Sequence, residues 1–170
     1  MNANCELKHE DLVRLLDYDV RTGVFRYRQR RGRMKPGDVA GTPHSRGYIQ
    51  IRVMGRIYLA HVLAWFYVFG EWPPGELDHR DTDKTNNRIG NLRPATRAQN
   101  CWNVGKQKNN TSGFKGVWWS KQKQRWIADI VRLGTWHHLG SFIEKADAVA
   151  AQERAANELH GEFSHGSMFA

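Results

Sequence analysis

Cysteine is scarce in this chain, and its two cysteines, Cys5 and Cys101, lie far apart in the 170 residues. Neither belongs to a C-x-x-C pair, so the sequence offers neither a disulfide framework nor a zinc ribbon. Such usage is typical of proteins in a reducing compartment. We therefore expect a cytoplasmic protein.

Long apolar runs are also absent. A helix that crosses a bilayer needs about 20 mostly apolar residues, and a signal peptide needs an apolar segment close to the amino terminus. The first residues instead carry charges at Glu6, Lys8, Glu10 and Asp11. We expect no membrane partner and no secretion signal.

Acidic residues are the minority charge, since 17 Asp and Glu stand against 26 Lys and Arg, for a net charge of +9. This excess predicts a polyanionic partner such as DNA. Part of it forms a basic run around Tyr27 that is better suited to holding phosphates than to packing a core. The run consists of Arg26, Arg28, Arg30, Arg31, Arg33 and Lys35.

The segment that begins at Glu76 combines the residue types that phosphodiester hydrolysis requires. Asp78 and His79 are followed by Asn91 and Asn100 in the spacing D-H-x11-N-x8-N. An imidazole, with an ordinary pKa of about 6.5, can take a proton from an attacking water near neutral pH. Carboxylate and carboxamide oxygens suit hard cations. We predict His79 as the general base, and Asp78 and Asn100 as ligands of one Mg²⁺ or Mn²⁺ ion per active site.

Two short strands and a long loop are expected around this base. Residues 76–79 and 91–95 are predicted to form the strands, with the polar residues 80–90 connecting them. Asn91 is expected to bond the backbone near His79 and so orient the imidazole. Loop stabilisation is the expected role of Asp81, Asn86 and Asn87.

A helix is predicted directly after the second strand. Thr96 has the character of an N-cap and Gln99 lies three residues later, which together make the T-x-x-Q pattern of a capping box. Asn100 would then lie in the first turns of this helix and face the two strands.

The whole stretch resembles the HNH nuclease motif of phage and intron-encoded homing endonucleases, in the variant whose last His is replaced by Asn. The preceding G-Y-I-Q-I-R-V-M-G-R-I-Y-L-A-H-V-L-A-W-F and the closing N-L-R-P-A-T-R-A-Q-N are similar to that family as well. Val62 stands where the family has an Arg after its lead-in His, and we assign no function to His61.

The resemblance implies a ββα-metal fold and the cleavage or nicking of double-stranded DNA. It implies that Asp78 and Asn100 bind the metal, that His79 is the general base and that Asn91 orients it. It also implies a phage or intron origin, with activity in the cytoplasm of a bacterial host.

Upstream of the motif, the pattern predicts further elements of the same domain. Helices are expected at 9–16 and 60–69, and hairpins at 19–27 and 48–59. We therefore predict one α+β nuclease domain over residues 1–104.

A polar segment without apolar residues follows at 105–112 and is predicted to be a linker. Two roles are open for its lysines, Lys106 and Lys108. They lie along a DNA groove, or they belong to a solvated connection.

The sequence of residues 113–170 predicts a second structural unit. Strands are expected at 114–119, 125–131 and 137–142, followed by an alanine-rich helix at 144–160. A three-stranded antiparallel sheet packed on one helix covers only one sheet face. The other face is left for solvent or a ligand.

This second unit resembles the ethylene-response-factor-type DNA-binding domain of the AP-two family. The similarity rests on F-K-G-V, W-I-A-D-I, L-G-S-F and the alanine-rich helix. It implies that the sheet lies in the major groove of DNA. The positions that it implies for DNA contact are Lys115, Trp118, Asp129, Trp136 and His138. Few arginines occupy this face, which favours modest base selectivity.

Together these features predict a two-domain, metal-dependent DNA endonuclease of the homing type, with no obligate protein partner evident. The alternative is a DNA-binding protein or regulator that keeps the nuclease frame without catalysis. An RNA-binding module would fit the charge and the aromatic residues, but it does not account for the D-H-x11-N-x8-N spacing.

Overall fold

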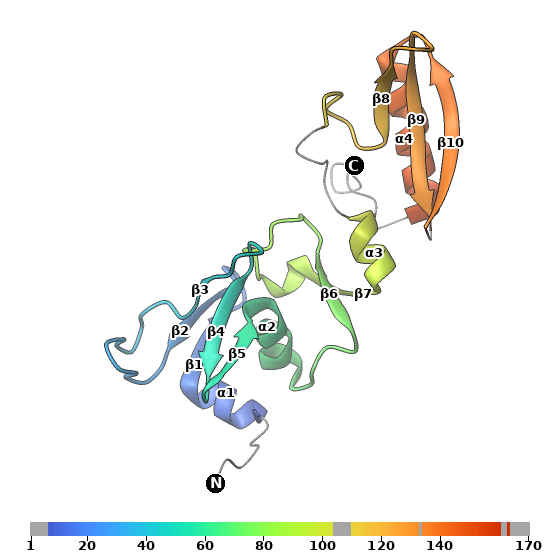
Figure 1. Ribbon diagram of the computed structural model, residues 1–170. Helices are drawn as coiled ribbons and strands as arrows, with labels where there is room; N and C mark the ends of the chain where they lie inside the picture. The colour runs from blue at the N-terminus through green and yellow to red at the C-terminus, as the bar shows by residue number, and fades with distance from the viewer. Residues whose placement is uncertain (1–6, 104–109, 133, 161–162, 164–170) are drawn as a thin grey trace. The chain divides into compact units, whose positions relative to one another are not determined.

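The computed structural model describes residues 7–103, 110–132, 134–160 and 163 (Figure 1). Its contacts divide the chain into two compact units, Met1–Ala95 and Thr96–Ala170, and each is described by itself. Helices and strands occur in both units, which confirms the predicted mixture of the two. Most of the predicted linker lies outside the described residues, and so do Lys106 and Lys108.

The first unit opens with α1 (His9–Leu15) and a two-stranded hairpin, β1 (Leu16–Asp19) and β2 (Val24–Tyr27). Tyr18 lies opposite Phe25 in this hairpin, and both rings are buried, with centroids 4.7 Å apart. The hairpin therefore contributes Tyr18 and Phe25 to the hydrophobic core of the first unit.

A three-stranded antiparallel sheet follows, in the order β3 (Thr42–Pro43), β4 (Ile49–Val53), β5 (Arg56–Leu59). Ile51 and Val53 alternate inward along β4 and are almost fully buried, as a strand with one covered face requires. The short β3 was not foreseen, because two residues carry no readable alternation.

Helix α2 (Ala60–Phe69) matches its predicted bounds and contacts α1, β4 and β5. It ends at Gly70, which adopts the left-handed conformation (φ 72°) that favours glycine after a helix. Leu63, Ala64 and Phe66 point into the core. Neither this helix of 10 residues nor any other in the described part of the chain is long and apolar enough to cross a membrane.

The motif segment forms an antiparallel pair, β6 (Glu76–His79) and β7 (Leu92–Ala95), joined by a polar loop. A single 3-10 turn, η1 (Ile89–Asn91), ends this loop. The second strand thus begins one residue later than predicted, because Asn91 completes the turn.

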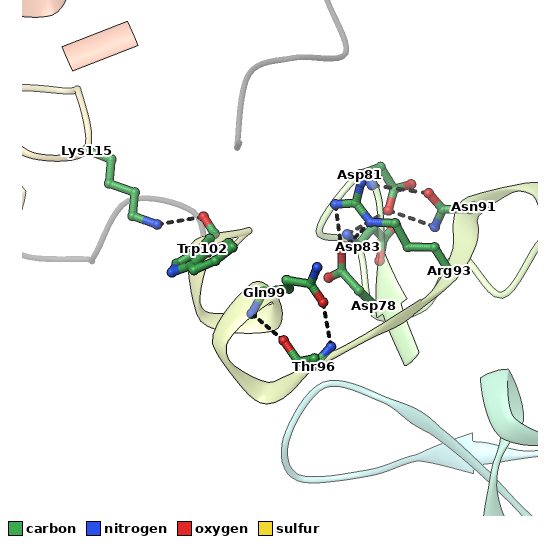
Figure 2. A network of polar contacts seen from close by, with 9 residues as sticks. All are labelled: Asp78, Asp81, Asp83, Asn91, Arg93, Thr96, Gln99, Trp102 and Lys115. Atoms are coloured by element: carbon green, nitrogen blue, oxygen red, sulfur yellow. Dashed lines mark hydrogen bonds and ion pairs between the residues drawn. The ribbon is translucent and has the colours of Figure 1, made fainter. Parts of the chain in front are cut away.

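The second unit begins with the short helix α3 (Arg97–Trp102), and the predicted capping box is confirmed. The Gln99 amide N donates to Thr96 Oγ1 at 3.3 Å, and the Thr96 amide N donates to Gln99 Oε1 at 2.8 Å (Figure 2). Two of the amide groups at the helix start are thereby satisfied.

The rest of this unit is an antiparallel sheet in the order β10 (Thr135–Phe142), β9 (Arg125–Arg132), β8 (Val117–Ser120), with α4 (Lys145–His160) against it. A small core between sheet and helix consists of Val117, Ala128 and Ala148. Small side chains at Ala128 and Ala148 let the helix approach the sheet closely. Strand β8 starts three residues later than predicted.

Candidate active site

Asp78 and His79 end strand β6 and are both buried, with 8% and 5% of their surfaces exposed. Asp78 lies opposite Arg93 of β7, and the two side chains form an ion pair. Arg93 donates to Asp78 Oδ2 from Nε at 2.8 Å and from Nη2 at 2.7 Å (Figure 2). This buried pair fixes the orientation of the Asp78 carboxylate. Arg93 was not predicted to belong to the site.

The imidazole of His79 is contacted by Asn87, from the loop between β6 and β7. His79 Nε2 lies 3.3 Å from Asn87 Oδ1. The Asn87 side-chain nitrogen donates to the Thr85 carbonyl at 3.1 Å, which turns Oδ1 toward His79. Because Oδ1 can only accept, Nε2 carries the imidazole proton. Nδ1 is then the ring atom that can take a proton.

Burial lowers the pKa of His79, whereas the Asn87 hydrogen bond and the carboxylates of Asp81, Asp78 and Asp83 raise it. Burial is the largest of these effects, since it disfavours the charged form of an imidazole. His79 is therefore neutral near pH 7, which is the form that a general base requires.

His61, for which no function was predicted, lies against His79. It is 5% exposed, and the two ring centroids are 4.9 Å apart in an edge-on arrangement. The Tyr48 ring contacts both, at 5.1 Å from His61 and 6.0 Å from His79. Burial, and to a smaller extent His79, lowers the pKa of His61 to about 3, so it packs as a neutral ring. Its only sequence signal was a lone imidazole in an apolar helix.

Asn91 braces the loop that follows His79. Its Oδ1 accepts from the Asp81 amide N at 3.1 Å, and its Nδ2 donates to Asp81 Oδ1 at 2.9 Å (Figure 2). The same Nδ2 also donates to the Asn86 carbonyl at 2.9 Å. Asn91 was expected to bond the backbone near His79, and it bonds the amide N of Asp81, two residues after His79. The side chain that contacts His79 Nε2 is that of Asn87 rather than Asn91.

The loop roles predicted for Asp81 and Asn86 are confirmed, since Asn86 Nδ2 donates to Asp81 Oδ2 at 2.5 Å. Asp83 accepts from both the amide and the hydroxyl of Thr85, and these bonds lower the pKa of the Asp83 carboxyl. Short polar side chains therefore replace regular secondary structure in this connection.

The predicted ligand Asn100 lies on α3, in the second unit, while Asp78 lies in the first. Within the described ranges, no group of three or more His, Cys, Asp and Glu residues could hold a metal ion. The described residues therefore contain no metal site built entirely from such side chains. One carboxylate and one carboxamide remain a donor set that suits Mg²⁺, which commonly retains several waters. Their joint role stays a prediction.

The basic run divides into two groups. Arg26, Arg28 and Arg31 donate to the carbonyls of Gly37, Leu16 and Arg52, respectively. Arg30, Arg33 and Lys35 are exposed, and in the part of the chain that is described their side chains have no hydrogen-bond or ion-pair partner. The second group is the one available to phosphates.

In the second unit, Asp129 holds two of the predicted DNA-contact residues together. Trp118 Nε1 donates to Asp129 Oδ2 at 2.8 Å, and His138 Nδ1 lies 2.8 Å from Asp129 Oδ1. The carboxylate is only 8% exposed, while Trp118 and Trp136 are 48% and 70% exposed. Asp129 thus orients the Trp118 and His138 side chains.

Lys115, also predicted to contact DNA, is half-buried and points at the carboxyl end of α3. Its Nζ donates to the Trp102 carbonyl at 2.9 Å (Figure 2). It also approaches the Cys101 carbonyl at 3.5 Å. Burial lowers the pKa of Lys115. A lysine at this place satisfies carbonyls that a helix end leaves without partners.

Comparison with known proteins agrees with this site. Residues 58–101 match a family model described as HNH endonuclease. The matched range runs from β5 through α2, β6 and β7 to α3, and so contains Asp78, His79, Asn91 and Asn100. It ends before β8, and the AP-two resemblance of the second unit stays a prediction.

Two viral proteins are similar to the chain. Protein 3.8 of Escherichia phage T7 is 36% identical over 105 residues, which cover 61% of this chain and 86% of that protein. An uncharacterized HNH endonuclease of Acanthamoeba polyphaga mimivirus is 30% identical over 119 residues, which cover 69% of this chain and 61% of that protein. No solved structure gives a significant match. The chain belongs to the same family as protein 3.8 of phage T7 and carries an HNH endonuclease domain.

Proposed function

We propose that this protein is a metal-dependent endonuclease of the homing type that hydrolyses phosphodiester bonds of double-stranded DNA. The observation that carries the proposal is the pair at the end of β6. There His79, with a neutral and oriented imidazole, directly follows Asp78 in the sequence, inside the segment that matches the HNH model.

In the proposed reaction, His79 Nδ1 takes a proton from a water molecule as the water oxygen attacks phosphorus. The new bond joins that oxygen to phosphorus, and the bond from phosphorus to the 3′ oxygen breaks, with its electron pair leaving on that oxygen. Asn87 supports this step because it holds the imidazole proton on Nε2. Asn91 stabilises the loop that follows His79 by accepting a hydrogen bond from the Asp81 amide N.

Asp78 and Asn100 are the proposed ligands of a single Mg²⁺ or Mn²⁺ ion, within the ββα-metal arrangement implied by the resemblance. When bound, the ion supplies Lewis-acid stabilisation of the negative charge that develops on phosphate and leaving oxygens. The Arg93 ion pair holds the Asp78 carboxylate in one orientation for this purpose.

Removal of divalent cations tests this assignment. Supercoiled plasmid should be nicked with Mg²⁺ or Mn²⁺ present and remain intact with a chelator, and Asn100→Ala should lose cleavage while keeping its affinity for DNA. The reason is that the ligands act on the ion, whereas phosphate contacts lie on other residues. Cleavage by Asn100→Ala at the rate of the unsubstituted protein would remove it from the ligand set.

Double-stranded DNA is the proposed partner of both units. In the first unit, the exposed side chains of Arg30, Arg33 and Lys35 are the proposed phosphate contacts. In the second, we propose an AP-two-like sheet that presents Trp118, Trp136 and His138 around Asp129. The similarity to a phage protein supports the host-cell cytoplasm as the place where this DNA is met.

Replacing Arg30, Arg33 and Lys35 together by Ala should flatten the salt dependence of DNA binding. Each phosphate contact contributes about 0.9 to the slope of log affinity against log salt, so the triple variant should lower the slope by about two to three. Arg26→Ala is the matched control, because its guanidinium donates to the Gly37 carbonyl. Titrations of duplex DNA over a salt series measure both, and equal slopes for triple variant and unsubstituted protein would exclude these three contacts.

A further inference from the structure

The loop that carries Asn87 is held in place by the amino-terminal hairpin, which lies outside the segment matched to the family model. Tyr18 of β1 is 6% exposed, and its hydroxyl donates to the Asn87 carbonyl at 2.7 Å. The two residues are 69 positions apart in sequence. A long-range bond thus links the hairpin to the residue that contacts the proposed base.

This bond persists over the whole physiological pH range. Burial raises the pKa of Tyr18 to about 12, although a hydrogen bond from the Ile89 backbone opposes this. The hydroxyl therefore remains protonated and able to donate. The Tyr18 ring is itself fixed between Phe25 and Tyr67, with centroids 4.7 and 5.6 Å away.

A second contact packs the hairpin turn against the peptide bond between Asn87 and Arg88. Gly23 has a φ of 74°, and a β-carbon placed on it would lie 2.5 Å from the Arg88 nitrogen and 2.6 Å from the Asn87 carbonyl carbon. Only a residue without a side chain fits there, because both neighbours are backbone atoms. Asn87 is consequently held by Tyr18 on its carbonyl and by Gly23 at its peptide.

We infer that Tyr18 is a positioning residue for His79 and acts through Asn87, so that the amino-terminal hairpin completes the active site. The chain of contacts runs from the Tyr18 hydroxyl to the Asn87 carbonyl, and from Asn87 Oδ1 to His79 Nε2. Its catalytic consequence rests on the proposed function, whereas its structural part, the state of the His79 ring, does not.

Tyr18→Phe is the direct test, because it removes the hydroxyl and keeps the ring. Single-turnover cleavage of bound DNA should slow by about tenfold, less than loss of the base itself, since a small misplacement of a catalytic group is costly. Affinity for DNA should not change. The matched control is Tyr67→Phe, whose ring belongs to the same cluster.

A double-variant cycle separates positioning from a general loss of stability. If Tyr18 acts through Asn87, then Tyr18→Phe should have almost no further effect on the rate in an Asn87→Ala background. Independent, multiplicative losses would overturn the inference.

The glycine contact provides a second perturbation with its own control. Gly23→Ala introduces the clash with Asn87 and Arg88, while Gly55→Ala creates the same kind of backbone strain at a φ of 83° with no atom within 4 Å. Only Gly23→Ala should slow cleavage. Equal effects of the two substitutions would show that backbone strain, rather than displacement of Asn87, is responsible.

A spectroscopic readout distinguishes failure of this inference from failure of the proposed function. Nitrogen chemical shifts of the neutral His79 ring, recorded without DNA or metal, should indicate a proton on Nε2 in the unsubstituted protein and a mixture of tautomers in Tyr18→Phe. Unchanged shifts in Tyr18→Phe overturn the positioning role whatever the rates. Altered shifts in a protein that never cleaves DNA would support the contact and refute the nuclease proposal.

Discussion

His79→Ala should reduce the single-turnover rate of DNA cleavage by about 100-fold or more, the usual scale for loss of a general base. The imidazole is neutral near pH 7, with its proton on Nε2, and it lies in contact with Asn87 and His61. Chemistry should therefore suffer far more than binding.

His137→Ala is the matched control for this substitution, since its imidazole is exposed on the second unit. It should cleave at the rate of the unsubstituted protein. The two rates are measured with enzyme in excess over labelled DNA, and affinity is measured in parallel. A His79→Ala protein that cleaves bound DNA at the unsubstituted rate would remove His79 from the mechanism.

Asp78→Ala should abolish cleavage and also destabilise the fold. It would leave the Arg93 charge buried without its carboxylate, and breaking a buried pair in this way costs about 3–5 kcal/mol. Urea unfolding followed by circular dichroism gives the free energy of unfolding, and cleavage is measured below the transition. The effect on stability follows from the burial of both partners, at 9% and 5% side-chain exposure.

Two further variants separate the structural role of Asp78 from its catalytic role. Asp17→Ala breaks the exposed pair with Arg28 and should cost less than about 1 kcal/mol. Asp78→Asn keeps the shape and one acceptor oxygen, so it should fold better than Asp78→Ala while cleavage remains lost. If Asp78→Asn cleaves normally, the carboxylate does not serve as a metal ligand.

Much of the local structure could be predicted because its signals are short in range. The capping box at Thr96 and Gln99 and the bounds of α2 follow from residues within one or two helical turns. Strand β6 was likewise predicted with its correct ends. Each depends on spacing that is visible in the sequence itself.

The contacts around the candidate base could not be predicted in this way. Tyr18 reaches Asn87 across 69 positions, and His61 meets His79 only because α2 and β6 pack together. Asn87 was expected only to stabilise its loop, since nothing in its immediate sequence distinguishes it from Asn86. Pairings of this kind depend on the tertiary fold.

The DNA-contact predictions were limited for a related reason. Composition identifies a basic run but not which guanidiniums are occupied within the protein, as Arg26 and Arg28 are. The AP-two resemblance implied that Asp129 contacts DNA, yet its carboxylate accepts from Trp118 and lies against His138. Hydrogen-bond partners on neighbouring strands decide the availability of such side chains.

The most direct test of the central claim is nicking of supercoiled plasmid by the purified full chain, compared between the unsubstituted protein and His79→Ala at equal concentrations with Mg²⁺. We predict conversion to open-circular DNA by the unsubstituted protein, its suppression by a chelator, and a loss of about 100-fold or more in His79→Ala. A folded, DNA-binding protein that leaves the plasmid intact with both Mg²⁺ and Mn²⁺ would contradict the nuclease proposal and indicate a non-catalytic DNA-binding protein.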